Sequence, residues 1–352
     1  MRSFSYTGSP SQIVFGVDSR KTVAEWIVKA GCKHALVLST PYQKADAEAL
    51  AHEMDHLACG VYSGAVMHTP IDVTEAALKV VDETGADCVV SLGGGSTTGL
   101  GKAIAYRTDI FQIVVPTTYA GSEVTPILGQ TEDGRKTTVR DAKILPEIVI
   151  YDPSLTYGLP VAISVTSGLN AMAHAVEGLY AQDRNPVSTL MALEGLRAFA
   201  RSLPEIVKSP GNAEARGDAL YGAWLCGTVL GTVGMALHHK ICHTLGGSFD
   251  TPHAETHAIM LPHTAAFNAA SAASELSGAA EILGGSIGGG LWDFAKAIGA
   301  PQSLRDLGLT EADLDRAASL AIEKPYWNPR PIDLGSIRTL LQDAWEGRRP
   351  AD

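Results

Sequence analysis

The sequence predicts an α/β domain with a parallel sheet, followed by an all-helical domain. Short β-branched runs alternate with amphipathic helical segments from Ile13 to about Tyr151, a pattern typical of parallel strands joined by crossover helices. After Asp152-Pro153 the β-runs disappear, and alanine- and leucine-rich helical patterns continue along the rest of the chain. A chain of 352 residues has room for two domains. We therefore expect an α/β domain over residues 1–155 and a helical domain over residues 156–352.

Within the first domain, strands are expected where β-branched residues cluster, and helices where apolar residues recur every three to four positions. The expected strands cover residues 35–39, 60–64, 87–92, 112–116 and 148–151. The expected helices cover residues 21–30, 45–54, 73–84 and 97–107. A hairpin is expected over Thr131 to Arg140, because the Asp133-Gly134 pair favours the tight turn between two antiparallel strands.

The second domain is expected to contain helices alone. They cover residues 164–181, 186–202, 213–229, 235–245, 257–271, 291–298, 311–323 and 334–345. No internal repeat or low-complexity tract interrupts them.

The composition describes a compact acidic protein. Hydrophobic residues make up 45% of the chain, charged residues make up 18%, and the net charge is -11. Nucleic acids and anionic membranes bind basic surfaces, so this balance argues against both as partners. The N-terminal residues lack the apolar core of a signal peptide, and no stretch offers the roughly 18 apolar residues of a membrane span, so we expect a cytoplasmic protein. The five scattered cysteines form no CxxC pair and are expected to be reduced.

A glycine-rich turn follows the third expected strand. Gly93, Gly94 and Gly95 lead directly into Ser96 and Thr97 at the start of a helix. Glycine lets a ligand approach the backbone closely, and the first N–H groups of a helix attract an anion, so we expect this turn to bind a phosphate. Ser96 or Thr97 is expected to cap the helix. The spacing departs from GxGxxG, the standard Rossmann fingerprint, and a glycine turn without function is the alternative.

Two further polar turns follow strands of the same expected sheet. Thr117, Thr118 and Ser122 come after the fourth expected strand, and Ser39 and Thr40 come at the end of the first. Ligands of parallel sheets bind at the carboxyl ends of the strands, so these residues are expected to flank one nucleotide, with ordinary helix capping as the alternative. The first strand is followed by no carboxylate that would repel a 2′-phosphate and by no arginine that would hold one. Discrimination between NADH and NADPH should therefore be weak.

Six of the eleven histidines lie within residues 237–263. His239 and His243 are four residues apart and share one face of a helix, and the Gly246-Gly247 pair is expected to reverse the chain and bring His253 towards them. Neutral imidazole binds metals and titrates near physiological pH. The cluster is therefore either a metal site or a proton-handling, anion-binding pocket, and a histidine-rich surface is the alternative.

Asn170 and His174 form a second pair four residues apart, in a segment expected to be helical. They share a helix face and, with His239 and His253, provide four candidate ligands. Cys242 lies among these histidines in the sequence. We expect it to be a structural thiol, because helical geometry turns it away from the histidine face by about 100° per residue.

With these residues in view, the chain resembles the iron-containing (group III) alcohol dehydrogenases and, among them, the maleylacetate reductases. The resemblance covers essentially the whole chain. It is carried by the segments GGGSTTGLGKAIA, PTTYAGSEVTPILG, GRKTTVRDAKILPEIVIYDP, LPVAISVTSGLNAMAHAVE, HHKICHTLGGSFDTPHAETHAIMLPH and KPYWNPRP. It implies the dehydroquinate synthase-like fold, with a nucleotide-binding α/β domain before the helical one. It also implies NADH as cofactor, with NADPH accepted too.

The resemblance also bears on metal binding. Metal-dependent members hold their ion with one Asp and three His, and the matching positions here are Asn170, His174, His239 and His253. A neutral amide replaces the one anionic ligand, so the resemblance implies an enzyme that requires no metal. Three imidazoles could still capture adventitious zinc or nickel.

The reaction implied by the resemblance is reduction of the carbon–carbon double bond of 2-maleylacetate to 3-oxoadipate, in the catabolism of resorcinol, hydroxyquinol and chloroaromatic compounds. Hydride adds to the carbon β to the ketone, an enolate forms, and a proton closes the α-carbon. Hydrogen-bond donors can stabilise such an enolate in place of a metal. His243, His253 and Tyr326 are the candidate donors. For Tyr326 and Trp327, an aromatic plug between the last helices is the alternative.

A substrate with two carboxylates requires positive partners. The cations near the motifs are Arg135, Lys136, Arg140, Lys240, Lys324 and Arg330. Each alone is more readily explained as a solvated surface charge, but as a set they favour a dicarboxylate over a simple alcohol. Relatives are commonly dimers, so we expect a homodimer by analogy.

Three other functions are considered. A metal-dependent alcohol or polyol dehydrogenase of the same fold is disfavoured by Asn170. A dehydroquinate synthase-like lyase would need zinc and more phosphate-binding lysines. A non-catalytic nucleotide-binding module is disfavoured by the dense histidine cluster.

Overall fold

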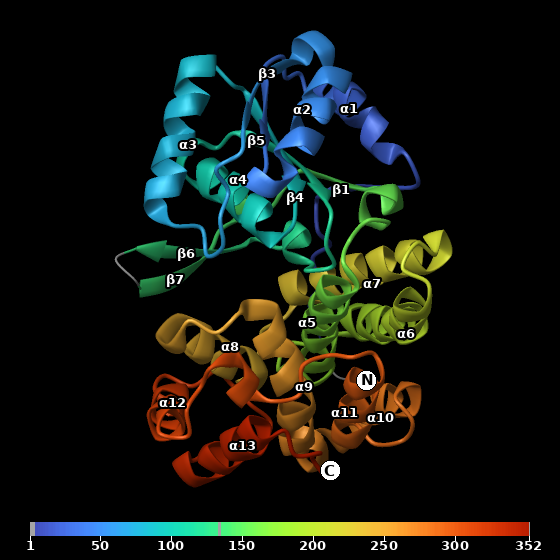
Figure 1. The fold of residues 1–352 in the computed structure, drawn as a ribbon, viewed down its shortest axis with the longest axis vertical. Coiled ribbons are helices and arrows are strands. Elements are labelled where there is room, and N and C mark those ends of the chain that lie inside the picture. Colours follow the sequence, from blue (N-terminus) through green and yellow to red (C-terminus); the bar gives the residue numbers. More distant parts are fainter. Residues whose placement is uncertain (1–3, 133–134, 352) are drawn as a thin grey trace. The chain divides into compact units, whose positions relative to one another are not determined.

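A computed structural model describes residues 4–132 and 135–351, without the side chains of Arg135 and Lys136. The chain divides into two compact units, Gly8–Leu159 and Pro160–Asp352, with the N-terminal residues up to Thr7 joining the second. The first unit holds the sheets, and the second unit is helical (Figure 1). The predicted fold class, an α/β domain followed by a helical domain, is confirmed.

The first unit is built on a six-stranded parallel sheet with the order β1-β8-β5-β4-β2-β3. Its strands are β1 (Gln12–Phe15), β2 (Ala35–Leu38), β3 (Ala58–Tyr62), β4 (Cys88–Gly93), β5 (Phe111–Pro116) and β8 (Ile148–Tyr151). The two edge strands depart most from expectation: β1 was not anticipated, and β3 begins two residues before the predicted start. Both are incompletely buried, so their sequences lack the continuous apolar run that marks the central strands.

Helices cover both faces of this sheet (Figure 1). Helices α1 (Val23–Lys29) and α2 (Lys44–Glu53) pack on one face, and α3 (Ile71–Thr84) and α4 (Gly95–Thr108) pack on the other. The central strands β4 and β2 are neighbours although β3 lies between them in the sequence. The strand order therefore reverses beside the carboxyl end of β4, the position where open α/β sheets bind ligands.

A separate antiparallel ribbon joins β6 (Ile127–Glu132) to β7 (Arg135–Arg140). The two strands are the hairpin predicted for this stretch. Its turn, Asp133-Gly134, lies outside the described residues.

The second unit is a bundle of helices. They are α5 (Val161–Tyr180), α6 (Pro186–Lys208), α7 (Ala213–Thr232), α8 (Leu237–Phe249), α9 (His253–Ala269), α10 (Ala273–Ile282), α11 (Gly288–Ala297), α12 (Asp313–Ile322) and α13 (Leu334–Glu346). The helix α10 was not anticipated. Helix α6 continues through Pro204, which the prediction treated as lying beyond its end.

The predicted turn at Gly246-Gly247 is wrong. Helix α8 runs through both glycines to Phe249, and the chain reverses at Asp250, whose φ is 53°. Pro252 then precedes the first residue of α9. Aspartate tolerates this left-handed conformation and proline favours a helix start, so the reversal needs no glycine.

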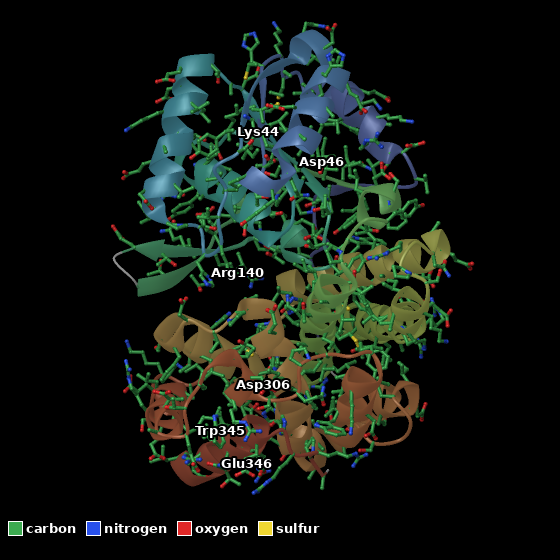
Figure 2. The ribbon with its side chains drawn as sticks, in the orientation of Figure 1. Lys44, Asp46, Arg140, Asp306, Trp345 and Glu346 are labelled. Carbon is green, nitrogen blue, oxygen red and sulfur yellow. The ribbon has the colours of Figure 1, made fainter. Side chains whose placement is uncertain are left out.

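Helices α8, α9, α12 and α13 share one apolar core. Trp345, labelled in Figure 2, lies near the carboxyl end of α13. Its indole Nε1 donates to the Leu309 carbonyl at 2.7 Å. This contact ties the last helix to the segment before α12. The core thereby fixes α8 and α9, which carry most of the histidine cluster.

In the described part of the chain, no single helix has the length and apolar character of a membrane span. Helices α7 and α8 meet those criteria only as a pair bent by 96°.

Candidate functional site

The histidine cluster of the second unit is built from α5, α8 and α9. Asn170, His174 and Glu177 follow one another along a face of α5, at spacings of four and three residues. All three are buried. Helix α8 supplies His238 and His239, which are also buried, and His243, which is half-buried.

Glu177 organises the start of α8. Its Oε2 accepts from the Ala236 backbone N–H at 2.9 Å and contacts His239 Nδ1 at 2.6 Å. Its Oε1 accepts from the His238 backbone N–H at 2.7 Å. The carboxylate therefore occupies the N-terminal end of a helix, where backbone N–H groups and the helix dipole favour a negative charge.

The Glu177 carboxylate also determines which nitrogens of neutral His239 and His174 carry hydrogen. An ionised carboxylate only accepts hydrogen bonds, so His239 Nδ1 must be its donor. His239 Nε2 is then bare and accepts from His174 Nδ1, which lies 3.0 Å away. The hydrogen-bond chain therefore runs from His174 through His239 to Glu177.

These residues do not fit a tightly bound divalent cation. Asn170 offers a neutral Oδ1, which is buried and has no hydrogen-bond partner among the described residues. The groups of His, Cys, Asp and Glu with metal-like spacing in the described residues are His238–Cys242–His257 and Cys32–Asp87–Cys88, and neither is the family's ligand set.

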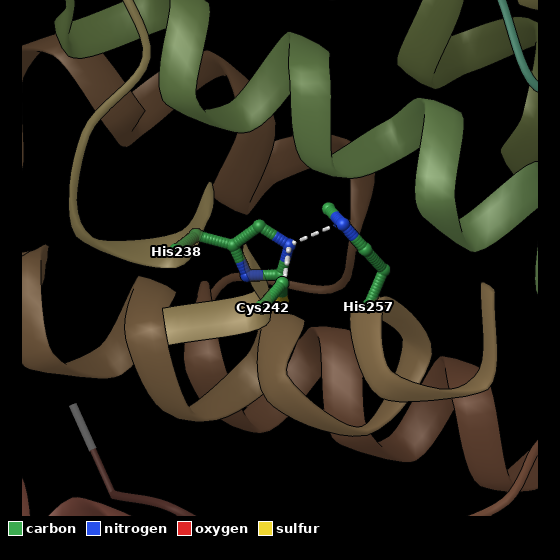
Figure 3. A group of neighbouring side chains, drawn as sticks. All are labelled: His238, Cys242 and His257. Atoms are coloured by element: carbon green, nitrogen blue, oxygen red, sulfur yellow. Dashed lines mark hydrogen bonds between the residues drawn. The ribbon is translucent and has the colours of Figure 1, made fainter. Parts of the chain in front are cut away.

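His238 and His257 form a second histidine pair (Figure 3). His238 Nε2 and His257 Nδ1 are 2.9 Å apart, and the Cys242 sulfur is 3.7 Å from the same His238 nitrogen. Burial raises the pKa of the Cys242 thiol well above its ordinary value. This environment agrees with the predicted structural thiol rather than with a nucleophile.

His243 and Tyr326 meet at the less buried side of the cluster. His243 Nδ1 and the Tyr326 hydroxyl are 3.2 Å apart. Tyr326 is 37% exposed and Trp327 is 42% exposed. These two aromatic residues therefore do not form the buried plug between the last helices that was the alternative. Burial and the charge of Glu177 raise the pKa of Tyr326.

The segment that carries Tyr326 is anchored to α9. Asn328 and Asn268 exchange side-chain hydrogen bonds at 2.9 and 2.7 Å. Arg330 donates to the Phe267 carbonyl at 3.0 Å, and its guanidinium lies 4.0 Å from the centre of the Phe267 ring. Arg330 therefore helps to hold the segment in place, and the residue is exposed.

His253 is the first residue of α9 and is half-buried. Its ring centre lies 4.4 Å from that of His257, one helical turn along. The ring of His257 in turn lies 5.1 Å from that of His239. His253 thus approaches the cluster through His257, a histidine that the sequence prediction did not single out.

One of the expected cations lies near His243. Lys240 is one turn before it on α8 and is half-buried. Burial lowers the pKa of Lys240, and the neighbouring charges of Glu323 and Lys324 act on it in opposite directions. By contrast, Arg140 lies exposed at the end of β7 in the other unit (Figure 2).

In the first unit, the glycine turn lies between β4 and α4. The residue before α4 is Gly94, and no side chain caps the helix, so the expected cap by Ser96 or Thr97 is wrong. Instead, Thr97 Oγ1 is buried without a hydrogen-bond partner among the described residues. The first N–H groups of α4 therefore lack the side-chain oxygen that usually satisfies them.

The three glycines of this turn have different surroundings. Gly93 has a φ of +150°, and a Cβ there would lie 2.5 Å from Thr97 Oγ1. A Cβ on Gly94 would lie 2.9 Å from Thr118, so the first and second polar turns pack together. A Cβ on Gly95 would meet nothing within 4 Å, and this residue is exposed. The open side of the turn fits the approach of a dinucleotide's phosphates.

The second polar turn is held by a buried lysine that the prediction did not name. Lys102 Nζ donates to the carbonyls of Ser122 at 2.5 Å and Ile127 at 2.9 Å, and to Thr125 Oγ1 at 2.9 Å. Burial lowers the pKa of Lys102 to about 7. Thr117 is also engaged, because Gln43 Nε2 donates to its hydroxyl at 3.1 Å.

The third polar turn follows β2. Ser39 is buried, and its hydroxyl donates to Ser63 at 3.1 Å. Thr40 is half-buried and precedes a short 3-10 helix. Ser39 is therefore placed to shape the turn, and Thr40 is the more accessible of the two.

Glu177 and Lys102, like His257, are residues that the sequence prediction missed. Glu177 continues the spacing of Asn170 and His174 on α5, so the helical period could have identified it. Lys102 closes the segment GGGSTTGLGK, on a helix face whose other residues are apolar or small. A charged residue on such a face signals a buried partner network.

Comparisons with known proteins match both units. A family model described as iron-containing alcohol dehydrogenase matches residues 10–153. One described as Fe-containing alcohol dehydrogenase family, C-terminal, matches residues 164–345. The maleylacetate reductase of Rhizobium sp. (strain MTP-10005) is 62% identical, over 99% of this chain and 100% of its own. That of Sphingobium indicum is 52% identical, over 99% of each chain.

A solved structure gives the same result. The crystal structure of maleylacetate reductase from Agrobacterium tumefaciens matches with a TM-score of 0.97 and 62% identity, over 99% of this chain and 100% of that one. The predicted resemblance is confirmed. The chain belongs to the iron-containing alcohol dehydrogenase family and, within it, to the maleylacetate reductases.

Proposed function

We propose that this chain is an NAD(P)H-dependent oxidoreductase that reduces the carbon–carbon double bond of 2-maleylacetate to give 3-oxoadipate, without a required metal. Full-length relatives that carry the name maleylacetate reductase support the reaction. The observation that carries the proposal is the distance of 3.2 Å between His243 Nδ1 and the Tyr326 hydroxyl. In the neighbouring histidine cluster, Asn170 occupies the position at which metal-dependent family members have an anionic ligand.

The His243–Tyr326 pair supplies the proton of the reaction. When bound, a reduced nicotinamide supplies the hydride for the carbon β to the ketone. A tyrosine phenol is protonated at neutral pH, and burial and the charge of Glu177 raise the pKa of Tyr326 further. Tyr326 can therefore hydrogen-bond to the enolate oxygen or protonate the α-carbon, and His243 can return a proton to it across their shared contact.

Lys240 and Lys324 are the cations proposed to bind the substrate carboxylates. Burial lowers the pKa of Lys240, the charge of Glu323 raises it, and the charge of Lys324 lowers it. A substrate carboxylate placed between the two lysines would favour their protonated forms. Such a preference for an anion would distinguish a dicarboxylate from a simple alcohol.

The glycine turn is proposed to hold the cofactor's phosphates. Gly95 leaves the first turn of α4 open, and the packed Gly93 and Gly94 fix its shape. Neither Ser39 nor Thr40 carries a charge that would repel or attract a 2′-phosphate. We therefore propose that NADH is the cofactor and that NADPH is accepted too.

Chelator-treated enzyme provides the test. NADH and maleylacetate are mixed with EDTA-treated protein under anaerobic conditions, and the absorbance of the reduced nicotinamide is followed. We expect oxidation at the rate of untreated enzyme. Loss of activity that returns with iron or zinc would instead favour the metal-dependent alcohol dehydrogenase alternative.

The N170D variant tests the explanation for metal independence. Restoring a carboxylate beside His174 should raise the affinity for Zn²⁺, because an anionic ligand offsets the charge of the ion. Isothermal titration of wild type and N170D with Zn²⁺ measures the difference. Equal affinities would remove this explanation.

A further inference from the structure

His238 is hydrogen-bonded through both ring nitrogens and has no exposed surface. Its Nδ1 lies 2.9 Å from Thr264 Oγ1, and its Nε2 lies 2.9 Å from His257 Nδ1. In a neutral imidazole one nitrogen donates and the other accepts. The direction of the first of these bonds therefore decides the direction of the second.

The Thr264 hydroxyl sets that direction. It has one hydrogen, and its oxygen lies 2.9 Å from the carbonyl of Met260, one turn earlier on α9. A buried threonine in a helix ordinarily donates to this carbonyl. Its oxygen is then left to accept from His238 Nδ1. His238 Nε2 is bare, and both the His257 Nδ1–H and the Cys242 thiol can donate to it.

The same assignment fixes His257. Its hydrogen lies on Nδ1, so Nε2 is a bare lone pair, and this atom is buried without a hydrogen-bond partner among the described residues. The opposite assignment would place an N–H at that atom with no acceptor. Buried orphan N–H groups are rarer in proteins than unsatisfied acceptors, which supports the first assignment independently of Thr264.

The His257 lone pair lies among the rings of the proposed site. The ring centre of His257 is 4.4 Å from His253, 5.1 Å from His239 and 6.3 Å from His174. The ring of His257 is fully buried. The single N–H groups of His239 and His174 are already donated to Glu177 and His239. The cluster thus contains a fixed hydrogen-bond acceptor beside His253, the nearest of the neighbouring rings.

We propose that Thr264 and His238 hold His257 in a single tautomer, so that His257 Nε2 acts as an acceptor that orients the imidazole of His253 beside the catalytic cluster. The chain of hydrogen bonds ends at the Met260 carbonyl, which cannot take up a proton, so it orients His257 rather than conducting protons. The role in catalysis rests on the proposed function. His257, His238 and Thr264 are positioning residues in this scheme.

Nitrogen NMR reads the tautomers directly in the resting enzyme. Protein labelled with ¹⁵N-histidine gives distinct signals for protonated and bare ring nitrogens, and the H257M variant identifies the signals of His257 among the eleven histidines. We expect hydrogen on Nδ1 of both His238 and His257. Hydrogen on His257 Nε2 would overturn the proposal. The spectrum needs no substrate, so it decides the tautomer assignment whether or not the protein reduces maleylacetate. Failure to reduce maleylacetate would overturn the proposed function and leave the tautomer assignment to the spectrum.

Variants test the role in turnover. H257M removes the acceptor and should lower kcat about 10- to 100-fold, the usual effect of losing an orienting partner of a site histidine. Binding of NADH, measured by fluorescence titration, should be unchanged. H52M, on the exposed face of α2, is the matched control and should behave as wild type. Unchanged kcat in H257M would overturn the role.

Thr264 supplies a graded comparison. T264S keeps the hydroxyl and should match wild type in spectrum and kcat. In T264V each tautomer leaves one orphan N–H, so the second tautomer should rise from below about one tenth to about one half. The kcat should then fall only about twofold, in proportion to the remaining correct tautomer. A T264V spectrum identical to wild type would show that Thr264 does not set the tautomer.

Discussion

Replacement of Glu177 by glutamine tests the one carboxylate that α5 contributes to the histidine cluster. The carboxylate receives the backbone N–H groups of Ala236 and His238 and the ring N–H of His239. Glutamine has nearly the same shape, so E177Q tests hydrogen bonding and charge without opening a cavity.

The magnitude follows from counting acceptors. In either orientation, the amide replaces one oxygen by an NH₂ group and leaves one of the two backbone N–H groups without an acceptor. A buried orphan donor costs about 1–3 kcal/mol. If the NH₂ faces His239, that ring must also reverse its tautomer, and its bond from His174 reverses with it. We therefore expect a loss of about 1–3 kcal/mol in the free energy of unfolding and of about 10- to 100-fold in kcat.

Urea unfolding and steady-state kinetics with maleylacetate measure the two effects. E281Q, an exposed position on α10, is the control and should change stability by less than about 0.5 kcal/mol. Binding of NADH should be the same in all three proteins. Wild-type stability and kcat in E177Q would refute the role assigned to this carboxylate.

Three further predictions concern the proton donors, the glycine turn and the buried lysine. H243A and Y326F should each lower kcat about 100-fold with little change in the Kd for NADH, and equal losses in both would indicate structural roles. G95A should keep the wild-type Tm and weaken NADH binding about tenfold. G93A should instead lose about 1–3 kcal/mol of stability, because Gly93 has a φ of +150° and a Cβ there would meet Thr97. A stable G93A, or a G95A that lost stability but bound NADH normally, would contradict the proposed cofactor turn. The Lys102 pKa of about 7 in the folded chain lies below the value of about 10.4 in the unfolded chain, so the folded chain binds fewer protons between these values. The stability of wild type relative to K102M should therefore rise with pH above about 7, by at most about 1.4 kcal/mol per unit, and urea unfolding that gave a pH-independent difference would exclude this.

The central strands and most helices could be predicted because the local pattern of apolar residues indicates which positions are buried. Strands β4 and β5 are continuous apolar runs, and the helices of the second unit repeat apolar residues with a helical period. Edge strands such as β1 face a partner on one side only, and their half-buried sequences carry a weak pattern. The reversal after α8 was misplaced because Gly246-Gly247 is the stronger local turn signal, but helix packing carries α8 past it to Asp250.

The site was harder to predict than the fold because its chemistry depends on contacts between distant residues. Helical spacing paired Asn170 with His174 but could not reveal that His174 bonds to His239, 65 residues away. The contact of His243 with Tyr326 spans 83 residues and was expected only as a set of candidate donors. His257 was missed because nothing in its own neighbourhood in the sequence indicates an unpartnered nitrogen.

The charges of the cluster explain why an amide suits position 170. Glu177 already places one buried carboxylate seven residues further along the same face of α5, stabilised by backbone N–H groups and His239. A second buried carboxylate at position 170 would need a cation to offset both its desolvation and its repulsion of the first. With asparagine there, Glu177 is the one carboxylate on this face of α5, and it is hydrogen-bonded to His239, which is hydrogen-bonded in turn to His174. The amide at position 170 therefore avoids the repulsion that a second buried carboxylate would add beside Glu177.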